Sequence, residues 1–324
     1  MSTEAELLSN VAIFSGNAHK KLAKKIAKYL DLELSPISID KFSNDNIEVQ
    51  LGVSVRGKDV FLVQPLVPPT SDHLMELLLM IDIARMSGAK NIHAVIPHYS
   101  YGRSDKKDAP RISITARLVA DMLVTAGADH IVAMTLHSPQ VHGFFSIPTD
   151  HLTAHSVFVK HFKEQDLSNT VVVSPDIGNA KRASKLSHSL GVPLAIGQKK
   201  RISDESVNIG SVLGEVKGKR CIIFDDEIAT GGTIVELADH LHHAGAGAIS
   251  VATTHGLFLK KAKKRLDALE HVTEIVTTNT VPVPKNKRPE KLTTLDVGHI
   301  FGEVIRRNLI GESIGELFEF WPDS

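Results

Sequence analysis

The sequence TARLVADMLVTAGADHIVAMTLH at residues 115–137 aligns without gaps with TIVELADHLHHAGAGAISVATTH at residues 233–255. The offset is 118 residues, and ten of the 23 positions are identical: Thr, Ala, Asp, Leu, Ala, Gly, Ala, Ile, Thr and His. Helix propensity makes Ala and Leu common in any two helices, but it does not place Thr, Asp, Gly and His in one register. We therefore interpret the segments as a duplication, each copy a helix, an Ala-Gly-Ala turn and a strand that ends in His.

Short apolar runs alternate with helical patterns along the rest of the chain. The runs are rich in β-branched residues and flanked by Pro, Gly, Ser or Asp, as buried parallel strands are. They lie at residues 60–63, 92–96, 131–135, 171–173, 221–224 and 249–253. Helices are expected at 18–30 and 72–87, the second with Asp72 as N-cap and Gly88 just after its end. The alternation predicts an α/β protein with a mostly parallel sheet, flanked by helices, in each copy of the duplication.

The duplication predicts two domains, which agrees with about 150 residues per domain for a chain of 324 residues. We place the first domain at residues 1–149 and the second at residues 150–307. A last helix is expected at residues 295–309. The apolar tail, about 308–324, is a candidate to pack back on the first domain, on the second, or on a neighbouring subunit.

The composition excludes several classes of protein. The 37 Lys and Arg residues balance 37 Asp and Glu residues, which argues against binding nucleic acid or a membrane surface by bulk charge. Cys221 is the single cysteine, so an intrachain disulfide and a cysteine-based zinc site are excluded. The acidic start lacks a signal-peptide pattern, and no apolar run approaches the ~18 residues of a membrane span. We expect a cytoplasmic protein with neither nucleic acid nor membrane as a partner.

The sequence CIIFDDEIATGGT at residues 221–233 carries the strongest chemical signal. An apolar strand runs into Asp225 and Asp226, followed by a loop of small residues and a helix. Gly231 and Gly232 let backbone N–H groups turn inward, and the helix N-terminus favours an anion there. A plain strand–helix turn with an acidic N-cap explains two adjacent acids less well. Because paired carboxylates repel a bare phosphate but suit sugar hydroxyls or a Mg²⁺ bridge, the predicted ligand is a sugar phosphate.

Three other strand ends carry polar side chains. Residues 96–107 (IPHYSYGRSDKK) hold Arg103 and Lys106, cations that suit a polyphosphate, although basic loops usually face solvent. His137 and Asp176 each follow a strand, and each alone is more typical of a structural histidine or a turn. The sequence contains no P-loop, Rossmann, zincin or nucleophile-elbow motif.

These segments occur in one order, together with Phe42-Ser43-Asn44, residues 143–145 and Lys199-Lys200-Arg201. From about residue 10 to residue 318 the chain resembles the ribose-phosphate pyrophosphokinase (phosphoribosyl pyrophosphate synthetase) family. The resemblance implies two phosphoribosyltransferase-type domains. It also implies transfer of the β,γ-diphosphoryl group of ATP to the C1 hydroxyl of ribose 5-phosphate, which gives phosphoribosyl pyrophosphate and AMP, with Mg²⁺ as cofactor.

The family's roles carry over to the matching positions. Lys199 and Arg201 match the catalytic residues of a mobile loop, and His137 and Asp176 match the Mg²⁺-associated pair. The positions that match ATP-binding residues are Phe42, Asn44, Asn46, Arg103, Ser104 and Asp105. The positions that match ribose 5-phosphate-binding residues are Asp225, Asp226, Ala229, Thr230, Gly231, Gly232 and Thr233.

The chain departs from the family pattern at several of these positions. Asn44 and Asn46 stand where the family has Asp and Glu for adenine recognition. An Asn can still accept and donate hydrogen bonds to adenine, so ATP remains the expected nucleotide. Ser104 stands where many members have Gln, and Ala229 replaces an acid found in many members' ribose loop.

The resemblance also implies regulation. Phosphate activates the family and ADP inhibits it, at a subunit interface of homo-oligomers that are often hexamers. The positions that match this allosteric site are Ser54, Arg56, Arg85 and Ser313. Gly315 replaces a serine and Ala109 an arginine of that site, which predicts altered or weakened control.

Two alternative functions stay open. A phosphoribosyltransferase would share the loop at residues 225–233, but it has one domain and explains neither the duplication nor Lys199 and Arg201. A non-catalytic, synthetase-associated regulatory subunit would explain Asn44 and Ala229. The intact Lys199 and Arg201 argue against that second alternative.

Overall fold

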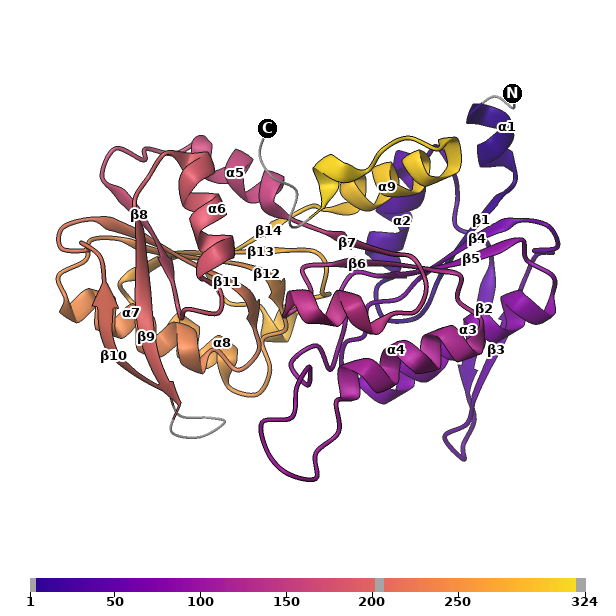
Figure 1. Ribbon diagram of the computed structural model, residues 1–324, viewed down its shortest axis with the longest axis horizontal. Helices are drawn as coiled ribbons and strands as arrows, with labels where there is room; N and C mark the ends of the chain where they lie inside the picture. Colours follow the sequence, from indigo (N-terminus) through magenta and orange to yellow (C-terminus); the bar gives the residue numbers. More distant parts are fainter. Residues whose placement is uncertain (1–3, 202–206, 319–324) are drawn as a thin grey trace. The chain divides into compact units, whose positions relative to one another are not determined.

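The computed structural model describes residues 4–201 and 207–318, and of residues 199–201 and 207–210 it describes the backbone without the side chains. The chain divides into two units, Met1–Thr153 with Val297–Ser324 and Ala154–Asp296 (Figure 1). Both units contain a mostly parallel sheet with helices on both faces, which confirms the predicted α/β class. None of the helices in the described ranges is long and apolar enough to cross a membrane.

Unit 1 is built on a parallel sheet with the strand order β1-β4-β5-β6-β7. Its strands are β1 (Val11–Ser15), β4 (Asp59–Val63), β5 (Asn91–Ile96), β6 (His130–Met134) and β7 (Thr149–Leu152). Its helices are α1 (Glu4–Ser9), α2 (Lys20–Tyr29), α3 (Thr70–Met86), α4 (Thr115–Ala126), α9 (Gly298–Ile310) and the 3₁₀ turns η1 (Pro139–Phe144) and η3 (Gly315–Leu317). Helices α3 and α4 cover one face of the sheet, and α2 and α9 cover the other (Figure 1).

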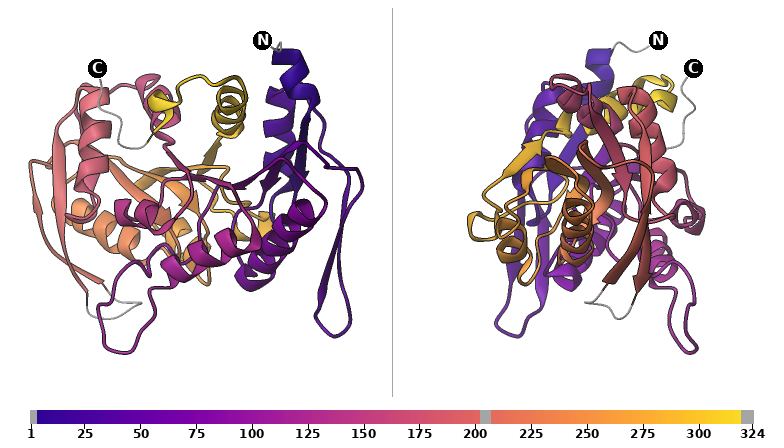
Figure 2. Two further views of the ribbon diagram at one scale, coloured as in Figure 1. Left: turned by 45° about the vertical axis from the view of Figure 1, so that its right-hand side comes forward. Right: turned by 90° about the vertical axis from the view of Figure 1, so that its left-hand side faces the viewer.

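A separate antiparallel hairpin belongs to unit 1. It consists of β2 (Ile37–Lys41) and β3 (Ile47–Leu51), and Figure 2 shows it extending away from the sheet. Apolar side chains of both strands, Ile39 and Val49 among them, pack against the α3 face of the core. The base of the hairpin is therefore fixed while its tip is exposed.

Unit 2 has the strand order β10-β9-β8-β11-β12-β13-β14, in which the β9–β10 pair is antiparallel and the other pairs are parallel. Its strands are β8 (Thr170–Ser174), β9 (Leu194–Arg201), β10 (Val207–Leu213), β11 (Arg220–Ile228), β12 (Ile249–Gly256), β13 (Val272–Thr278) and β14 (Leu292–Leu295). Its helices are α5 (His155–Lys163), α6 (Ala180–Leu190), α7 (Gly232–His243), α8 (Ala262–Asp267) and η2 (Lys285–Lys287). Helices α7 and α8 pack on one face, and α5 and α6 on the other.

The duplicated segments form the same local structure in the two units. Helix α4 leads into β6, which pairs with β5, and α7 leads into β12, which pairs with β11. The turn glycines Gly127 and Gly245 have φ angles of 116° and 82°, a left-handed conformation that favours glycine. The predicted helix, Ala-Gly-Ala turn and strand are thus confirmed in both copies.

The structure differs from the sequence prediction at the start of α3. The N-cap is Pro69, and Asp72 lies inside the first turn, where it pairs with Lys41 Nζ at 3.0 Å. The prediction of Asp72 as N-cap is therefore wrong, because the helix begins two residues earlier, at Thr70, directly after Pro69. Gly88, with φ 77°, follows the helix end as predicted.

The units also divide the chain at other places than the predicted domains. The first break falls after Thr153 rather than after residue 149, and α9 belongs to unit 1 rather than to the second domain. Helix α9 packs on α2 so closely that a Cβ built at Gly302 would lie 2.5 Å from the Tyr29 ring. Asn308 Nδ2 donates to Asp150 Oδ2 at 3.0 Å, which ties the same helix to β7. These contacts, made across long sequence separations, assign α9 to the first unit.

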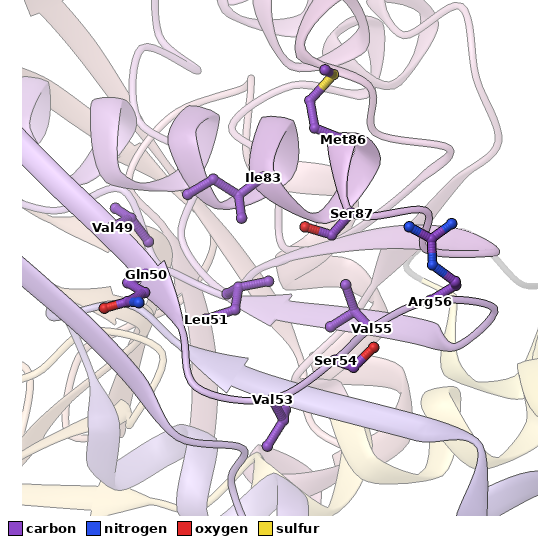
Figure 3. Close-up of a pocket in the computed structure, with 10 residues that line it drawn as sticks. All are labelled: Val49, Gln50, Leu51, Val53, Ser54, Val55, Arg56, Ile83, Met86 and Ser87. Atoms are coloured by element: carbon purple, nitrogen blue, oxygen red, sulfur yellow. The ribbon is translucent and has the colours of Figure 1, made fainter.

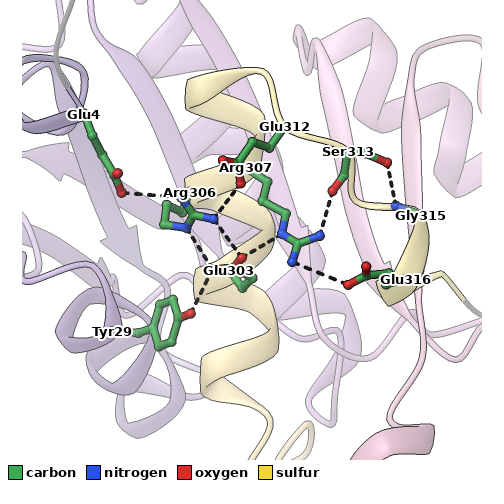
Figure 4. A network of polar contacts seen from close by, with 9 residues as sticks. All are labelled: Glu4, Tyr29, Glu303, Arg306, Arg307, Glu312, Ser313, Gly315 and Glu316. Atoms are coloured by element: carbon green, nitrogen blue, oxygen red, sulfur yellow. Dashed lines mark hydrogen bonds and ion pairs between the residues drawn. The ribbon is translucent and has the colours of Figure 1, made fainter.

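Glu303 is the centre of a polar network that holds α9 (Figure 4). Its carboxylate accepts hydrogen bonds from Tyr29 Oη at 2.8 Å, Arg306 Nε at 2.9 Å and Arg307 Nε at 2.6 Å. The Arg306 hydrogen bonds are the main cause that lowers the pKa of Glu303 to about 2. Glu312 also pairs with Arg306, at 2.7 Å, but its side chain is 54% exposed.

The Glu303→Gln variant is expected to lose about 2 kcal/mol of unfolding free energy at pH 7, since hydrogen bonds to charged groups contribute about 1.5–3 kcal/mol. Because the folded-state pKa lies below the ordinary value, the carboxylate stabilises the fold above the ordinary Glu pKa. That contribution is lost as the pH falls toward about 2. Urea unfolding at pH 7 and pH 3.5 measures the difference. The exposed Glu312→Gln is the control, with an expected loss under about 0.5 kcal/mol; equal losses in the two variants would contradict the prediction.

Candidate functional site

The loop between β8 and α6 in unit 2 presents Asp176. Ser174 Oγ donates to the Asp176 carbonyl at 2.7 Å, and Asp176 Oδ1 accepts the Asn179 N–H at 3.1 Å. Asn179 is 6% exposed, and its Nδ2 donates to the Phe224 carbonyl at 2.6 Å. Since Phe224 directly precedes Asp225, the Asn179 side chain fixes the Asp176 loop to the carboxyl end of β11.

The two adjacent carboxylates lie in the last part of β11. The strand continues to Ile228, four residues beyond the predicted end, and Asp225 stands opposite Thr253 of β12. The Asp226 N–H donates to Asp225 Oδ1 at 2.9 Å, and Asp226 is 6% exposed. The carboxylates therefore have backbone positions set by the sheet, as sites built on rigid elements do.

The electrostatics of Asp225 indicate a site with excess negative charge. Burial raises its pKa well above the ordinary value, and the nearby negative charges of Asp226 and Asp176 raise it further. Asp176 follows β8 and Asp225 lies near the end of the neighbouring strand β11, and their carboxylates are close enough to interact electrostatically. Such a cluster favours a cation or hydroxyl donors as its ligand.

The backbone carbonyl groups at the end of β11 and in the loop that leads to α7 accept hydrogen bonds from the segment after β12 and from α8. The carbonyls of Ile228, Ala229 and Thr230 accept hydrogen bonds from Leu257, Leu259 and Arg265, at 2.9, 2.8 and 3.4 Å. Gly231 is the N-cap of α7 with φ 77°, and the helix begins at Gly232 and Thr233. The first N–H groups of a helix have no partner within the helix, so an anion can accept them here. The arrangement can hold a phosphate a few residues from two carboxylates.

In unit 1, Ser104 closes the long loop between β5 and α4. Its Oγ donates to the Ser113 carbonyl at 3.0 Å and accepts the Thr115 N–H at 3.3 Å, and its carbonyl accepts the Ala116 N–H at 3.2 Å. Ser104 therefore joins the two ends of the loop, and Arg103 beside it is exposed. Ser104, which matches an ATP-binding position of the family, thus stabilises the loop in this chain.

The predicted residues Asp105 and His137 are brought together. Ser138 Oγ donates to Asp105 Oδ2 at 2.5 Å, which links the loop after β5 with the loop after β6. A Cβ built at Gly102 would lie 3.4 Å from the His137 Cβ, so the backbone of Gly102 packs against His137. Arg103, Asp105 and His137 thus come from two loops at one edge of the unit 1 sheet.

The other predicted ATP-binding residues lie at the tip of the β2–β3 hairpin. Asn44 Oδ1 accepts the Asn46 N–H at 3.2 Å, and the Phe42 N–H donates to the Asn46 carbonyl at 2.8 Å. Phe42 is 52% exposed, which leaves its ring free to stack on a flat ligand. Asn44 uses one acceptor within the turn, so its amide group retains the donors for a base.

A pocket of about 560 Å³ lies between β3 and the end of α3 in unit 1 (Figure 3). It is lined by Ser54 and Arg56, two of the four predicted allosteric residues, together with Val49, Gln50, Leu51, Val53, Val55, Ile83, Met86 and Ser87. Arg85 is not a lining residue: its Nη1 donates to the Thr125 carbonyl at 3.3 Å. Ser313 lies after α9, where its carbonyl accepts Arg307 Nη1 at 2.7 Å (Figure 4).

Lys199 and Arg201 lie among the last three residues of β9, and residues 202–206 are outside the described ranges. Their backbones pair with Ile209 and Val207 of β10. Their side chains lie outside the described residues, so their predicted catalytic role stays a prediction. The family resemblance implies a mobile catalytic loop at these positions, and the backbones of both residues lie in the antiparallel β9–β10 pair.

Sequence reasoning missed Asn179, the residue that joins the Asp176 loop to β11. The only local signal is an Asn at the start of a helix, where it is usually read as an N-cap. Its side chain makes no cap hydrogen bond and bonds to the neighbouring strand instead. In the described ranges, no group of three or more His, Cys, Asp and Glu side chains could hold a metal ion.

The fold and the site define a two-unit α/β protein with carboxylates and a helix N-terminus at one sheet edge. The family model for the N-terminal domain of ribose phosphate pyrophosphokinase matches residues 11–127, and that for the phosphoribosyl synthetase-associated domain matches residues 205–319. The chain is 51% identical to a Streptomyces coelicolor relative, with 97% of this chain and 99% of that one covered. It is 46% identical to the ribose-phosphate pyrophosphokinase of Deinococcus radiodurans, with 96% and 98% covered.

A solved structure gives the same result in three dimensions. The phosphoribosylpyrophosphate synthetase of Mycobacterium smegmatis superposes with a TM-score of 0.88 at 41% identity, and 93% of this chain and 99% of that chain are covered. The chain belongs to the ribose-phosphate pyrophosphokinase family.

Proposed function

We propose that this chain transfers the β,γ-diphosphoryl group of ATP to the C1 hydroxyl of ribose 5-phosphate, giving phosphoribosyl pyrophosphate and AMP. The observation that carries the proposal is made at the carboxyl ends of β8 and β11 in unit 2. There Asp176 and Asp225 lie within electrostatic reach of each other, and α7 begins a few residues after Asp225. Relatives of 43–46% identity, each covered over 98% of its length, carry this activity in their names and support it. A phosphoribosyl pyrophosphate product would serve nucleotide biosynthesis.

In this proposal unit 2 holds the sugar phosphate. The N–H groups and hydroxyls at Thr230, Gly231, Gly232 and Thr233 bind the 5-phosphate. Asp225 and Asp226 accept hydrogen bonds from the ribose hydroxyls and orient the C1 hydroxyl. Ala229 adds no side-chain hydrogen bond, so the two aspartates carry ribose recognition in this chain.

The residues of unit 1 hold the nucleotide in the same proposal. Phe42 stacks on the adenine, Asn44 and Asn46 bond its edge, and Arg103 neutralises phosphate charge. Lys199 and Arg201 of unit 2 stabilise the negative charge that develops as the β,γ-diphosphoryl group is transferred. In phosphoryl transfer, positioning and charge stabilisation account for most of the protein's contribution.

Mg²⁺ is the cofactor that this site suits. Carboxylate oxygens are its preferred protein ligands, and it is commonly held by one or two carboxylates together with substrate phosphates. We propose that the carboxylate of Asp176, close to Asp225, holds it in unit 2. In unit 1 we propose His137 as the residue associated with the ion. When bound, Mg²⁺ neutralises phosphate charge during the transfer.

The decisive assay incubates the purified protein with Mg-ATP and ribose 5-phosphate and follows AMP by chromatography and phosphoribosyl pyrophosphate by ³¹P NMR. Both products are expected, and the absence of AMP with or without added phosphate would refute the proposed activity. A phosphoribosyltransferase would instead consume phosphoribosyl pyrophosphate when a base is supplied. A regulatory subunit would be inactive alone and would change the rate of an active relative.

We also propose that the pocket lined by Ser54 and Arg56 binds phosphate or ADP as an effector, in a homo-oligomer for which a hexamer is the first candidate. Arg56 supplies the charge and Ser54 a hydroxyl. Because Arg85 is engaged at Thr125, the phosphate arm of the assay is expected to show weak activation.

A further inference from the structure

The backbone that carries His137 turns sharply at Thr135. Strand β6 ends at Met134, and Thr135 follows with φ 46° in the left-handed region. A β-branched residue is rarely found there, because its side chain is sterically crowded in this conformation. Thr135 is 5% exposed, so the surrounding structure must hold this turn in place.

Two hydrogen bonds from β7 hold the turn. The Thr135 N–H donates to the Leu152 carbonyl at 2.9 Å, and the Leu136 N–H donates to His151 Nε2 at 2.9 Å. Leu136 and His151 are each 2% exposed, so water does not replace the second bond. The His151 side chain therefore acts on the residue directly before His137.

The chemistry of this bond fixes the state of the ring. A backbone N–H can only donate, so His151 Nε2 must offer a lone pair to it, and a neutral ring then carries its proton on Nδ1. Loss of the acceptor would leave the Leu136 N–H buried without a partner, which destabilises the turn. The strained turn would then have the Leu152 bond as its remaining support from β7.

Strand β7 is itself fixed from its other side by the C-terminal segment. The Thr153 N–H donates to the Leu317 carbonyl at 3.0 Å, and Leu152 forms an antiparallel bridge with Phe318. Strand β7, which supports the Thr135 turn, is thus held between β6 on one side and residues 317–318 on the other. Because β7 is paired on both sides, its His151 side chain can hold Leu136, the residue directly before His137, in a fixed position.

We propose that His151 is a positioning residue for the reaction: its Nε2 holds the Thr135–Leu136 turn in the conformation that presents His137. The inference rests on the proposed role of His137 toward Mg-ATP. Misplacement of a reacting group by about 1 Å can lower a rate about 10²-fold, so loss of this one acceptor has a large effect on turnover.

The test compares His151→Leu, which removes the acceptor, with His151→Gln, whose Oε1 restores one near the position of Nε2. For His151→Leu we expect kcat to fall about 10–10²-fold. The KM for ribose 5-phosphate should change less than about 2-fold, because the residues proposed to bind it lie in unit 2. Hydrogen–deuterium exchange of the peptide spanning residues 135–138 should become faster. His151→Gln should recover both kcat and slow exchange.

The nearby His142→Leu is the matched control. His142 is exposed and bonds the Thr149 carbonyl at 3.0 Å, so its loss should leave kcat and the exchange at residues 135–138 unchanged. A folded His151→Leu protein with kcat within about 2-fold of the parent would overturn the proposal. The proposal would also be overturned if His151→Leu and His151→Gln lost activity to the same extent and Tm to the same extent, because such losses would indicate a structural role. If the parent itself makes no AMP, the proposed function fails, and unchanged exchange in His151→Leu separately refutes the positioning role.

Discussion

Turnover of the Lys199→Ala variant is expected to fall about 10²–10³-fold, because a cation that stabilises charge in the transition state contributes about that much. Lys199 lies two residues before the end of β9, where its backbone pairs with Ile209. Binding of ATP precedes the growth of that charge, so the affinity for a non-hydrolysable ATP analogue should change little. AMP formation gives kcat, and calorimetric titration gives the affinity.

The control for this prediction is Lys200→Ala, which removes the adjacent positive charge of the same segment. Its kcat should stay within about 3-fold of the parent, because a cation contributes to the rate when it stabilises the transferred group, and the proposed mechanism assigns that role to Lys199 and Arg201. A loss of both turnover and nucleotide affinity in Lys199→Ala would indicate that the end of β9 shapes the site rather than acting on the transferred group.

The Asp225→Asn variant is expected to be less active and more stable than the parent. Its kcat/KM for ribose 5-phosphate should fall about 10–10²-fold, since a hydrogen bond to a charged group contributes about 1.5–3 kcal/mol. The Asn Oδ1 can still accept the Asp226 N–H, so the local backbone is preserved. Initial rates at varied ribose 5-phosphate measure the first effect.

The gain in stability follows from the raised pKa of Asp225. Since the folded-state pKa lies above the ordinary value, ionisation opposes folding, and the parent loses stability as the pH rises past the ordinary Asp pKa. Asn lacks this penalty, so at pH 7.5 in EDTA the variant should have a higher unfolding free energy than the parent, and the gain should disappear as the pH falls to the ordinary Asp pKa.

Asp166→Asn provides a control of opposite sign. The Ser168 N–H donates to Asp166 Oδ1 at 2.9 Å and lowers the pKa of that exposed carboxyl. Its replacement should destabilise the protein slightly and leave activity unchanged. If Asp225→Asn proved less stable than the parent at pH 7.5, the carboxylate would have a stabilising partner that contradicts its raised pKa.

Local sequence signals predicted the features that depend on neighbouring residues. Apolar β-branched runs gave the strands, and Gly88 and Gly127 marked helix ends because left-handed backbone is easy for glycine. The prediction failed where a distant element engages a side chain. Asp72 lies inside the first turn and pairs with Lys41, and Asn179 bonds a carbonyl 45 residues away.

The sequence by itself determined the α/β class, the duplication and the carboxylates at the end of β11, because periodicity and side-chain chemistry are local properties. The tertiary structure decided what the duplicated Thr-x-His endings do. Thr253 continues in β12, paired with Asp225 and Thr277, and His255 stays in the sheet, bonded to Thr280 at 2.9 Å. The matching Thr135 turns out of β6 and presents His137, because hydrogen bonds from β7 hold a backbone conformation that threonine does not favour.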